Sequence, residues 1–453
     1  MTREIRKAAV LGSGTMGSGI AALLASVGVE VALLDIPEKG TTPADPPEGR
    51  SAPALAGLER ARATKAPAPL TDEEIARIRI GNFDDHLGWL ADVDWVVEVV
   101  VERLDIKRAL LERVVAAANP DAILSTNTSG IPIAAISEGF PPEVGRRLLG
   151  THFFNPPRVL KLLEIIPGAG TDPEILGFLS DYATNVLGKG VVPCKDTPNF
   201  IGNRFLTLIG AQAVAYALDH GFTVEEVDAI TGPLIGRPRT GTFRLYDLIG
   251  IDVMADIGRN LYPVIPNDPA RDLLHHPAAQ ALFERMVAEN RLGNKSGRGF
   301  YEVRKNAAGE KEFWTLDLNT FEYVPPAAPV FPSVTRHGGV PVVGERIRLL
   351  LSEGDRAAQF LWHHHAFYLS YASLRVPEIT DSLSAIDDAQ KWGFNHALGP
   401  FEIWDALGVA DTVPKFEAAG YPVASWVKEM IASGQLTFYR RDATGAVAGV
   451  WRV

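Results

Sequence analysis

The first 195 residues alternate short apolar runs with stretches in which apolar residues recur every three or four positions. Short apolar runs fit buried strands, and the wider spacing, clearest at 16–27 and 106–118, fits helices that pack on one face. Such alternation is typical of βαβ units that form a parallel sheet. We expect strands at residues 8–11, 30–34, 95–99, 123–125, 147–151, 162–166 and 191–194, the later ones antiparallel.

Beyond residue 195 the pattern becomes helical and stays so to about residue 286. Proline is favoured in the first turn of a helix, where its fixed φ is suitable and its missing N–H costs nothing. Pro198 therefore predicts a long helix over residues 199–220.

Two segments interrupt the regular patterns. Residues 37–53 are rich in Pro, Gly and Ala and predict an inserted loop. Residues 324–341 are rich in proline and follow a predicted small hairpin at 313–324, so they predict a semi-rigid linker. A second helical block then runs from about residue 345. The expected division is 1–195, 196–325, a linker at 326–344, and 345–453.

The two helical blocks share a sequence pattern. Gly241-Thr-Phe-Arg-Leu-Tyr-Asp-Leu-Ile-Gly250 recurs 158 residues later as Gly399-Pro-Phe-Glu-Ile-Trp-Asp-Ala-Leu-Gly408. Both read Gly-x-Phe-x-aliphatic-aromatic-Asp-x-x-Gly, a coincidence too extensive for chance. We interpret it as one helical domain present in two copies, and two copies make a duplicated domain, not a solenoid.

A glycine-rich motif follows the first predicted strand and opens the first predicted helix. Gly12 permits a tight turn, Gly14 lets the backbone approach a pyrophosphate, and Gly17 lets the helix pack on the strand. Thr15 and Met16 lie at the helix N-terminus, whose free N–H groups attract phosphates. The pattern predicts a Rossmann-type dinucleotide site, with a glycine-rich turn of an unrelated α/β protein as the alternative.

Asp35 ends the second predicted strand, about 20 residues after the glycine motif. A carboxylate in this position accepts hydrogen bonds from the ribose hydroxyls of NAD. Its charge repels the 2′-phosphate of NADP, so the predicted cofactor is NAD.

His152 lies at the end of one predicted strand, and Glu164 lies within the next. A neutral imidazole can remove a hydroxyl proton near pH 7 while a hydride leaves the same carbon. A carboxylate on the other ring nitrogen would fix the tautomer and stabilise the imidazolium. The two side chains can meet if the strands are adjacent and antiparallel. Equally open is a structural histidine with an unrelated surface glutamate.

Several motifs occur in one order along the chain, and together they resemble the L-3-hydroxyacyl-CoA dehydrogenase family of fatty-acid β-oxidation. The layout is similar to that of the long bacterial forms with a duplicated C-terminal domain, although we expect this chain to lack their enoyl-CoA hydratase domain. The motifs are the glycine motif, Glu98-Val-Val-Val-Glu102, Ser125-Thr-Asn127-Thr-Ser129, His152-Phe-Phe-Asn155-Pro, Glu164, Asp196-Thr-Pro-Asn-Phe-Ile-Gly-Asn203-Arg204 and Lys295-Ser-Gly297-Arg-Gly299-Phe-Tyr301.

The resemblance implies an α/β Rossmann-type N-terminal domain followed by two homologous all-α domains, and it implies roles for single residues. His152 would be the general base with Glu164 as its orienting partner. Ser129 and Asn203 would hydrogen-bond the substrate's 3-oxygen or the catalytic histidine. The residues implied to lie along the cofactor are Glu102, Lys107 and Asn127. Without its motif, Asn203 could equally be a polar helix residue facing solvent.

The chain departs from the family pattern in two places. The family usually has Pro-Met-Gly-Pro-Phe where this chain has Pro238-Arg-Thr-Gly-Thr-Phe243, which puts the acyl chain-length preference in doubt. The 37–53 insertion also interrupts the region where relatives build a helical arm over CoA. Arg60, Arg62 and Lys65 there could contact CoA phosphates or simply form a solvated basic face.

Composition narrows the possible partners. With 46% hydrophobic and 22% charged residues the chain is globular, and a net charge of −11 argues against binding nucleic acid or anionic membranes. The longest apolar run, 206–218, is too short to span a bilayer. The N-terminus enters a strand directly, leaving no room for a signal segment. We expect a cytoplasmic protein.

Metal chemistry is not expected. The single cysteine, Cys194, excludes a disulfide framework and should be buried. The run His363-His-His365, expected at the start of a helix, points around its axis, whereas ligands need a spacing of three or four to share a face.

The glycine motif and Asp35 predict an NAD-dependent dehydrogenase, and the resemblance implies that it acts on an acyl-CoA thioester. An NAD dehydrogenase of a free hydroxy acid remains an alternative, because the same fingerprint and base would serve it. A non-catalytic structural or binding paralogue is another, although the complete set of predicted catalytic residues disfavours it. The second helical copy could replace a partner subunit, so we expect a monomer with an internal pseudo-dimer that can associate with a hydratase or thiolase.

Overall fold

A computed structural model describes residues 3–453, and the chain forms two compact units, Met1–Phe200 and Ile201–Val453. The first two residues of the polar N-terminal segment lie outside the described part. The change from one unit to the next falls five residues after the boundary expected from the pattern.

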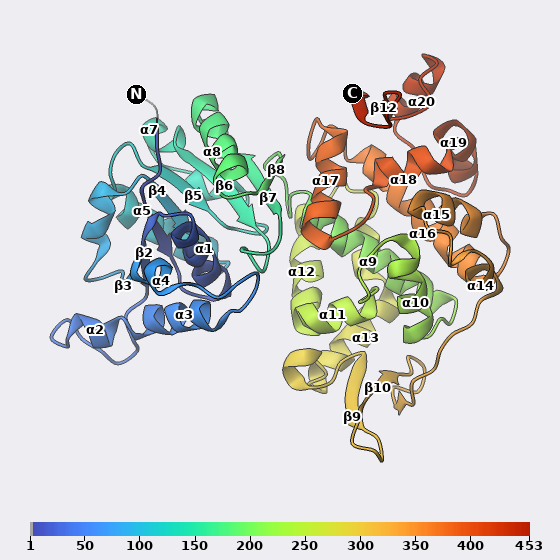
Figure 1. The fold of residues 1–453 in the computed structure, drawn as a ribbon, viewed down its shortest axis with the longest axis horizontal. Helices are drawn as coiled ribbons and strands as arrows, with labels where there is room; N and C mark the ends of the chain where they lie inside the picture. Colours follow the sequence, from blue (N-terminus) through green and yellow to red (C-terminus); the bar gives the residue numbers. More distant parts are fainter. Residues whose placement is uncertain (1–2) are drawn as a thin grey trace. The chain divides into compact units, whose positions relative to one another are not determined.

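The first unit is built on one eight-stranded sheet in the order β3-β2-β1-β4-β5-β6-β7-β8 (Figure 1). All neighbours pair in parallel except β6 and β7, which are antiparallel. This is a Rossmann-type parallel sheet with a short extension. The strands are β1 (Lys7–Leu11), β2 (Glu30–Asp35), β3 (Ile78–Asn82), β4 (Trp95–Glu98), β5 (Ile123–Thr126), β6 (Leu148–Phe153), β7 (Leu162–Pro167) and β8 (Gly190–Pro193).

Helices cover both faces of this sheet and bury a separate apolar cluster on each. Ile20 and Leu24 of α1 belong to one cluster, and Leu110 and Val114 of α5 belong to the other. Strands buried on both faces explain the nearly continuous apolar runs of the sequence. The helices are α1 (Thr15–Ser26), α2 (Pro47–Arg50), α3 (Ala52–Ala63), α4 (Asp72–Ala76), η1 (Leu87–Asp92), α5 (Leu104–Ala117), α6 (Ile133–Ser137), α7 (Pro142–Gly145) and α8 (Pro173–Asn185).

The insertion expected as a loop at 37–53 is only partly irregular. It contains α2 and the start of α3, and the buried Arg50 forms an ion pair with the partly exposed Asp85. A Cβ at Gly57 would come within 2.6 Å of the Ser13 Cβ, so α3 packs directly against the glycine-rich turn.

The second unit is mainly helical, with two small antiparallel sheets. The elements of its first half are α9 (Gly202–Asp219), α10 (Val224–Thr231), η2 (Pro233–Ile235), α11 (Phe243–Ile249), α12 (Ile251–Val264), η3 (Arg271–His275), α13 (Pro277–Ala288), η4 (Asn294–Ser296), β9 (Tyr301–Lys305), β10 (Lys311–Leu316) and β11 (Tyr323–Val324). Those of its second half are α14 (Pro332–His337), α15 (Val343–Leu351), α16 (Arg356–Leu374), α17 (Leu383–Phe394), α18 (Pro400–Leu407), α19 (Val409–Ala418), α20 (Ser425–Ala432), β12 (Tyr439–Arg441) and β13 (Val447–Val450).

Four expectations for this unit need correction. Helix α9 begins at Gly202, not at residue 199, because Asn199 and Phe200 have φ values of 61° and 48° that interrupt a right-handed helix. The expected hairpin is a three-stranded sheet. The expected linker contains α14, whose Ser333 is held by two hydrogen bonds to Asp355. The second helical block is not all-α, since β12 and β13 pair at its end.

The repeated sequence pattern corresponds to repeated hydrogen bonding. Asp228 accepts from Phe243 N at 2.7 Å and from Tyr301 Oη at 2.8 Å. Asp387 accepts from Phe401 N at 2.9 Å and Tyr439 Oη at 2.7 Å. The aspartate inside each repeated pattern also bonds the backbone at the following strand. Asp247 accepts from Phe300 N and Tyr301 N, and Asp405 accepts from Phe438 N and Tyr439 N.

Helices α9 and α16 of the two halves pack against each other (Figure 1). Phe205 and Tyr371 lie edge to face with ring centroids 5.3 Å apart, and His364 Nδ1 is 2.8 Å from Gln212 Oε1. Helix α16 begins at Arg356, so the three histidines at 363–365 lie in its middle and not at its start. Both His364 and His365 are fully buried.

Burial of these histidines predicts an acid-sensitive fold. Desolvation lowers the pKa of His365 to about 4 and holds that of His364 well below its usual value. Their unfolded forms take up protons below about pH 6.5, so the unfolding free energy should fall as the pH drops from 6.5 to 4. The expected loss is about 3 kcal/mol for His365 alone.

The measurement is urea unfolding of wild type and His365→Leu across this pH range. Burial raises the pKa of Asp228 to about 7 and those of Asp247 and Asp405 to about 6, which contributes a slope of opposite sign. Both proteins contain these three aspartates, so subtracting one unfolding free energy from the other at each pH cancels their contribution. The exposed His220→Leu serves as the control, and equal slopes for wild type and His365→Leu would refute the prediction.

None of the helices between residues 3 and 453 combines the length and apolar character that a membrane crossing needs. Over the same residues, no three His, Cys, Asp or Glu side chains are grouped so that they could hold a metal ion. Cys194 is buried and unbridged.

Candidate active site

The glycine-rich turn between β1 and α1 is shaped by close backbone contacts. Gly12 has a φ of +107°, and a Cβ there would lie 2.6 Å from the Val99 carbonyl oxygen. A Cβ at Gly17 would collide with the Gly12 carbonyl oxygen, whereas a Cβ at Gly14 would meet nothing within 4 Å. Two glycines are thus required by packing, and Gly14 leaves open space at the N-terminus of α1. The turn fits the pyrophosphate of a dinucleotide.

Asp35 ends β2 beside this turn. Its Oδ2 accepts hydrogen bonds from Ser13 N at 2.6 Å and Ser13 Oγ at 2.5 Å. Together with Gly14, Ile36 and Phe83 it lines a pocket of about 570 Å³. The largely apolar walls of the pocket suit an adenine ring, and the carboxylate suits ribose hydroxyls. Thr15 and Met16 form the first turn of α1 next to it.

Replacing Asp35 by alanine should narrow the preference for NAD over NADP. The carboxylate repels a 2′-phosphate, and its removal abolishes both that repulsion and the hydrogen bonds to the ribose hydroxyls. We expect the ratio of kcat/KM for NAD to that for NADP to fall at least about tenfold, which corresponds to about 1.4 kcal/mol. Steady-state kinetics with both cofactors measures it. A wild-type enzyme that already uses NADP equally well would contradict the assignment.

His152 and Glu164 face each other directly across the antiparallel strands β6 and β7. His152 Nδ1 lies 2.7 Å from Glu164 Oε2, and His152 Nε2 lies 3.1 Å from Ser129 Oγ. Glu164 is fully buried and the His152 side chain is 4% exposed. A carboxylate only accepts, so in the neutral imidazole the proton is on Nδ1 and the lone pair is on Nε2. The structure thus brings three of the four predicted catalytic side chains together.

Glu102 organises the loop that carries Ser129. Its Oε1 accepts from Thr128 Oγ1 at 2.5 Å, Ser129 N at 2.9 Å and Gly130 N at 3.1 Å. Burial tends to raise the pKa of Glu102, but the nearby Lys107 charge and these hydrogen bonds outweigh it and hold the pKa below its usual value. This predicted cofactor residue therefore also anchors the backbone around Ser129.

Lys107 and Asn127, which the resemblance implies to lie along the cofactor, make contacts within the protein. Lys107 is buried, and its Nζ lies 2.9 Å from Glu98 Oε1 and 3.3 Å from Glu102 Oε2. Asn127 Oδ1 accepts from Phe153 N at 2.8 Å, which ties β5 to the backbone next to His152. Lys107 thus holds Glu98 and Glu102, and Asn127 holds the strand that carries His152. Contact between either side chain and the cofactor stays a prediction.

Two supporting residues had no role assigned from the sequence, although Glu98 opens the motif Glu98–Glu102. Glu98 is a fully buried carboxylate that anchors Lys107, and a charged residue within the apolar run 95–101 was the available signal. Lys189 is buried as well; its Nζ donates to Leu160 O at 2.7 Å and to Pro157 O, both in the loop between β6 and β7. Burial lowers the pKa of Lys189 to about 8. No sequence pattern pointed to this residue.

The other candidates lie elsewhere. Asn203 belongs to the second unit, in the first turn of α9. Arg60 Nη2 donates to Ser13 O at 3.2 Å, and Arg62 pairs with Glu59. Lys65 is exposed. Contacts of these three basic residues with CoA phosphates stay a prediction.

Comparison with known proteins identifies the family. The NAD-binding domain of 3-hydroxyacyl-CoA dehydrogenase matches residues 7–197, and the C-terminal domain of the same enzymes matches residues 200–303. The chain belongs to the 3-hydroxyacyl-CoA dehydrogenase family. Its cofactor is accordingly NAD, in agreement with the glycine turn and Asp35.

Individual members of the 3-hydroxyacyl-CoA dehydrogenase family resemble the chain over different lengths. It is 41% identical to a Bacillus subtilis protein named "Probable 3-hydroxyacyl-CoA dehydrogenase" over 98% of its own length, but it spans only 56% of that relative. It is 36% identical to a 3-hydroxybutyryl-CoA dehydrogenase of Mycobacterium tuberculosis, over 66% of this chain and 99% of the relative. The crystal structure of 3-hydroxybutyryl-CoA dehydrogenase from Escherichia coli K12 has a TM-score of 0.69 and 25% identity, covering 95% of this chain and 99% of that one.

Proposed function

We propose that the chain oxidises (S)-3-hydroxyacyl-CoA thioesters to 3-oxoacyl-CoA with NAD, as a step of fatty-acid β-oxidation. The observation that carries the proposal is the order of contacts Glu164–His152–Ser129. In this arrangement His152 Nε2 lies 3.1 Å from the Ser129 hydroxyl, and a substrate hydroxyl would be received beside these two groups.

His152 acts as the general base in this proposal. Its Nε2 removes the proton of the 3-hydroxyl group while the C3–H bond breaks, and the C3–O bond becomes a carbonyl. The glycine turn and Asp35 would hold NAD, which would supply the acceptor for the hydride and its electron pair. The imidazolium formed on His152 is stabilised by the Glu164 carboxylate 2.7 Å from Nδ1.

Ser129 and Asn203 position the substrate. A hydroxyl and an amide can hydrogen-bond the 3-oxygen without competing for its proton. Ser129 is held by Glu102 through its backbone N–H, so its hydroxyl is presented in a fixed place. Holding the carbinol carbon in one orientation supplies much of the rate enhancement expected of such a site.

The test is oxidation of NADH by purified protein with acetoacetyl-CoA, followed by absorbance, beside the same assay with free acetoacetate. The proposal predicts turnover with the thioester and at most a trace with the free acid. Equal rates would favour a dehydrogenase of free hydroxy acids. No turnover with either substrate between pH 6 and 8 would favour a non-catalytic paralogue and would overturn the proposal.

We further propose that residues 196–325 and 345–453 are two copies of one helical domain joined by a linker. The paired networks around Asp228 and Asp387 support this, as does the packing of α9 on α16. The second copy would take the place of a partner subunit and give a cytoplasmic monomer with an internal pseudo-dimer.

Association with a hydratase or thiolase is part of the same proposal. A Rickettsia felis relative that is 35% identical over 89% of this chain is named "Putative fatty acid oxidation complex trifunctional enzyme". Neighbouring enzymes that supply hydroxyacyl-CoA or consume oxoacyl-CoA are the natural partners of the proposed reaction.

A further inference from the structure

Arg237, which lies in the loop between η2 and α11 of the second unit, holds a buried cationic group. Its Nη2 has no hydrogen-bond partner in the part of the chain that the structure describes. Burial lowers the pKa of the guanidinium, and no carboxylate within residues 3–453 offsets this effect. A buried charge without a partner is costly in free energy. The described residues therefore leave this cation without a counter-charge.

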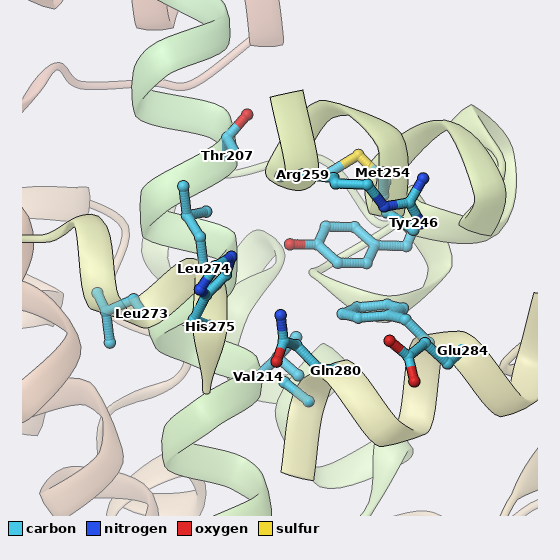
Figure 2. Close-up of a pocket in the computed structure, with 15 residues that line it drawn as sticks. Thr207, Val214, Tyr246, Met254, Arg259, Leu273, Leu274, His275, Gln280 and Glu284 are labelled. Atoms are coloured by element: carbon cyan, nitrogen blue, oxygen red, sulfur yellow. The ribbon is translucent and has the colours of Figure 1, made fainter. Parts of the chain in front are cut away.

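Two other arginines of the second unit show how such a charge is usually accommodated. Arg259 borders a pocket of about 100 Å³ lined by α9, α12 and α13, where it is exposed to solvent and pairs with Asp256 at 2.7 Å (Figure 2). Arg375 is buried and pairs with Asp268 at 3.0 Å. Arg237 differs from both, because its Nη2 reaches neither solvent nor a carboxylate.

Two side chains of α16 lie beside the Arg237 guanidinium. His364 and Tyr368 are four residues apart and therefore share one face of that helix. The Arg237 Cζ lies 5.4 Å from the centre of the Tyr368 ring. Burial and then the Arg237 charge hold the pKa of His364 well below its usual value. The Tyr368 hydroxyl and His364 Nε2 are buried, and among the described residues neither has a hydrogen-bond partner, so three unpartnered polar atoms gather here.

The loop between α17 and α18 adjoins the same guanidinium. Ala397 N donates to Gly236 O at 2.7 Å, which joins this loop to the residue before Arg237. Burial and then the Arg237 charge hold the pKa of His396 well below its usual value, so this ring is neutral near pH 7. His396 and Arg237 are each partly exposed as residues. A small ion can therefore reach this place from solvent.

Two carboxylates act electrostatically on Tyr368, but both are accommodated elsewhere. Burial raises the pKa of Asp387 well above its usual value, which favours the neutral acid. Glu402 forms an ion pair with Lys391 at 2.9 Å. Neither carboxylate raises the pKa of Arg237, so neither serves as its counter-charge.

We infer that Arg237, Tyr368 and His364 bind a monovalent anion of the size of chloride between the two halves of the second unit. The anion accepts from Arg237 Nη2 and from the Tyr368 hydroxyl, and its single charge balances the single guanidinium. The Gln212 amide oxygen lies 2.8 Å from His364 Nδ1, and a half-turn of the amide brings its NH₂ group there. Nδ1 then accepts and Nε2 carries the proton, so a neutral His364 becomes the third donor.

The surroundings favour a small ion with one charge. Phe205 packs against Tyr368, with ring centroids 6.1 Å apart. Phe360 packs against His364, with ring centroids 6.0 Å apart. Apolar neighbours lower the local dielectric constant, which makes the transfer of a doubly charged ion from water expensive. A halide needs little more space than a water molecule and accepts hydrogen bonds from any direction.

Thermal unfolding of the full chain in chloride and in gluconate, at equal ionic strength, tests the site. Tryptophan fluorescence suits the measurement, because six of the eight tryptophans lie in the second unit. We expect chloride to raise the Tm of wild type by at least about 3 °C, the shift given by a ligand present at about ten times its dissociation constant.

Arg237→Met separates an anion site from an arginine that is merely buried. Methionine keeps an unbranched side chain and removes the charge, so the Tm should no longer differ between the two salts. In gluconate the variant should melt at or above the wild-type temperature, because it has no unpaired charge to bury. The control is Arg239→Met, an exposed position two residues along the same loop, which should keep the full chloride response.

Tyr368→Phe tests the second donor without removing the cation. It keeps the ring beside the guanidinium and removes one hydrogen bond to the anion. The chloride concentration that gives half of the Tm response should rise at least about threefold. A response to chloride that is the same in wild type, Arg237→Met and Tyr368→Phe would overturn the inference.

Crystals of the full chain grown in sodium bromide locate the ion directly. Anomalous scattering should show bromide beside Arg237 Nη2 and the Tyr368 hydroxyl in wild type, and no bromide there in Arg237→Met. No peak at this place, together with equal Tm values in chloride and gluconate, would mean that only water occupies it and would overturn the inference. A peak without any chloride effect on Tm would mean an adventitious ion only, which would overturn it as well. None of these measurements needs turnover, so they are independent of the proposed function.

Discussion

Replacing His152 by glutamine should lower turnover by about 10²–10⁴-fold, the usual contribution of a positioned acid–base group. Glutamine keeps a polar side chain in the strand but cannot take the substrate proton. NAD affinity should change little, because the predicted cofactor contacts are made by the glycine turn and Asp35, not by His152. Steady-state kinetics for kcat and fluorescence titration of NADH for affinity measure the two effects separately.

Two further variants are compared with His152→Gln, one at its partner and one at an exposed control position. Glu164→Gln should also lower turnover, through loss of the charge that stabilises the imidazolium 2.7 Å away. The exposed His220→Gln should behave as wild type. If His152→Gln keeps its turnover and loses only cofactor binding, the assignment of His152 as the base is wrong.

A chain that ends at residue 329 should lose its monomeric state. The truncation removes α16 and uncovers the face of α9 that it packs against. Phe205 loses Tyr371, and Phe222 loses Phe360, whose ring centroid is 5.1 Å away. Each large apolar side chain exposed in this way costs about 1.5–3 kcal/mol. The truncated chain should form dimers or aggregates in light scattering.

The truncation also breaks a buried polar network. Asp268 Oδ2 lies 2.7 Å from Arg204 Nη2, 2.8 Å from Tyr371 Oη and 3.0 Å from Arg375 Nη1. In the truncated chain Asp268 loses Tyr371 and Arg375, and Arg204 loses Tyr371. The full chain at the same concentration is the reference, and we expect it to be monomeric. A truncated chain that remains a folded and fully active monomer would show that the second half has another role.

Much of the sheet could be predicted from sequence because its central strands are buried on both faces. Strands β1, β2, β4 and β5 therefore read as apolar runs with clear ends. Strand β3 was missed because it is an edge strand of the pattern Ile-Arg-Ile-Gly-Asn, in which Arg79 is exposed and breaks the run. The register was left open by the sequence, because His152 and Glu164 could meet only if their strands were adjacent and antiparallel. The structure pairs these two residues directly.

Other features depend on contacts that no local pattern contains. Nothing around Lys107 indicates that its charge is buried against Glu98, and nothing around Lys189 indicates that it binds two carbonyl groups of the loop between β6 and β7. The start of α9 depends on the left-handed backbone of Asn199 and Phe200, which the helical pattern and Pro198 concealed. Tertiary hydrogen bonds and backbone strain decided these details, not propensity or periodicity.

Hydride transfer from C3 is the central claim, and isotope transfer tests it most directly. Purified protein is incubated with NAD and (S)-3-hydroxybutyryl-CoA that carries deuterium at C3, and the products are analysed by mass spectrometry. We expect NADH that contains the deuterium, 3-oxobutyryl-CoA without it, and loss of both products in His152→Gln. Absence of labelled NADH with wild-type protein, or equal labelling from free 3-hydroxybutyrate, would contradict it.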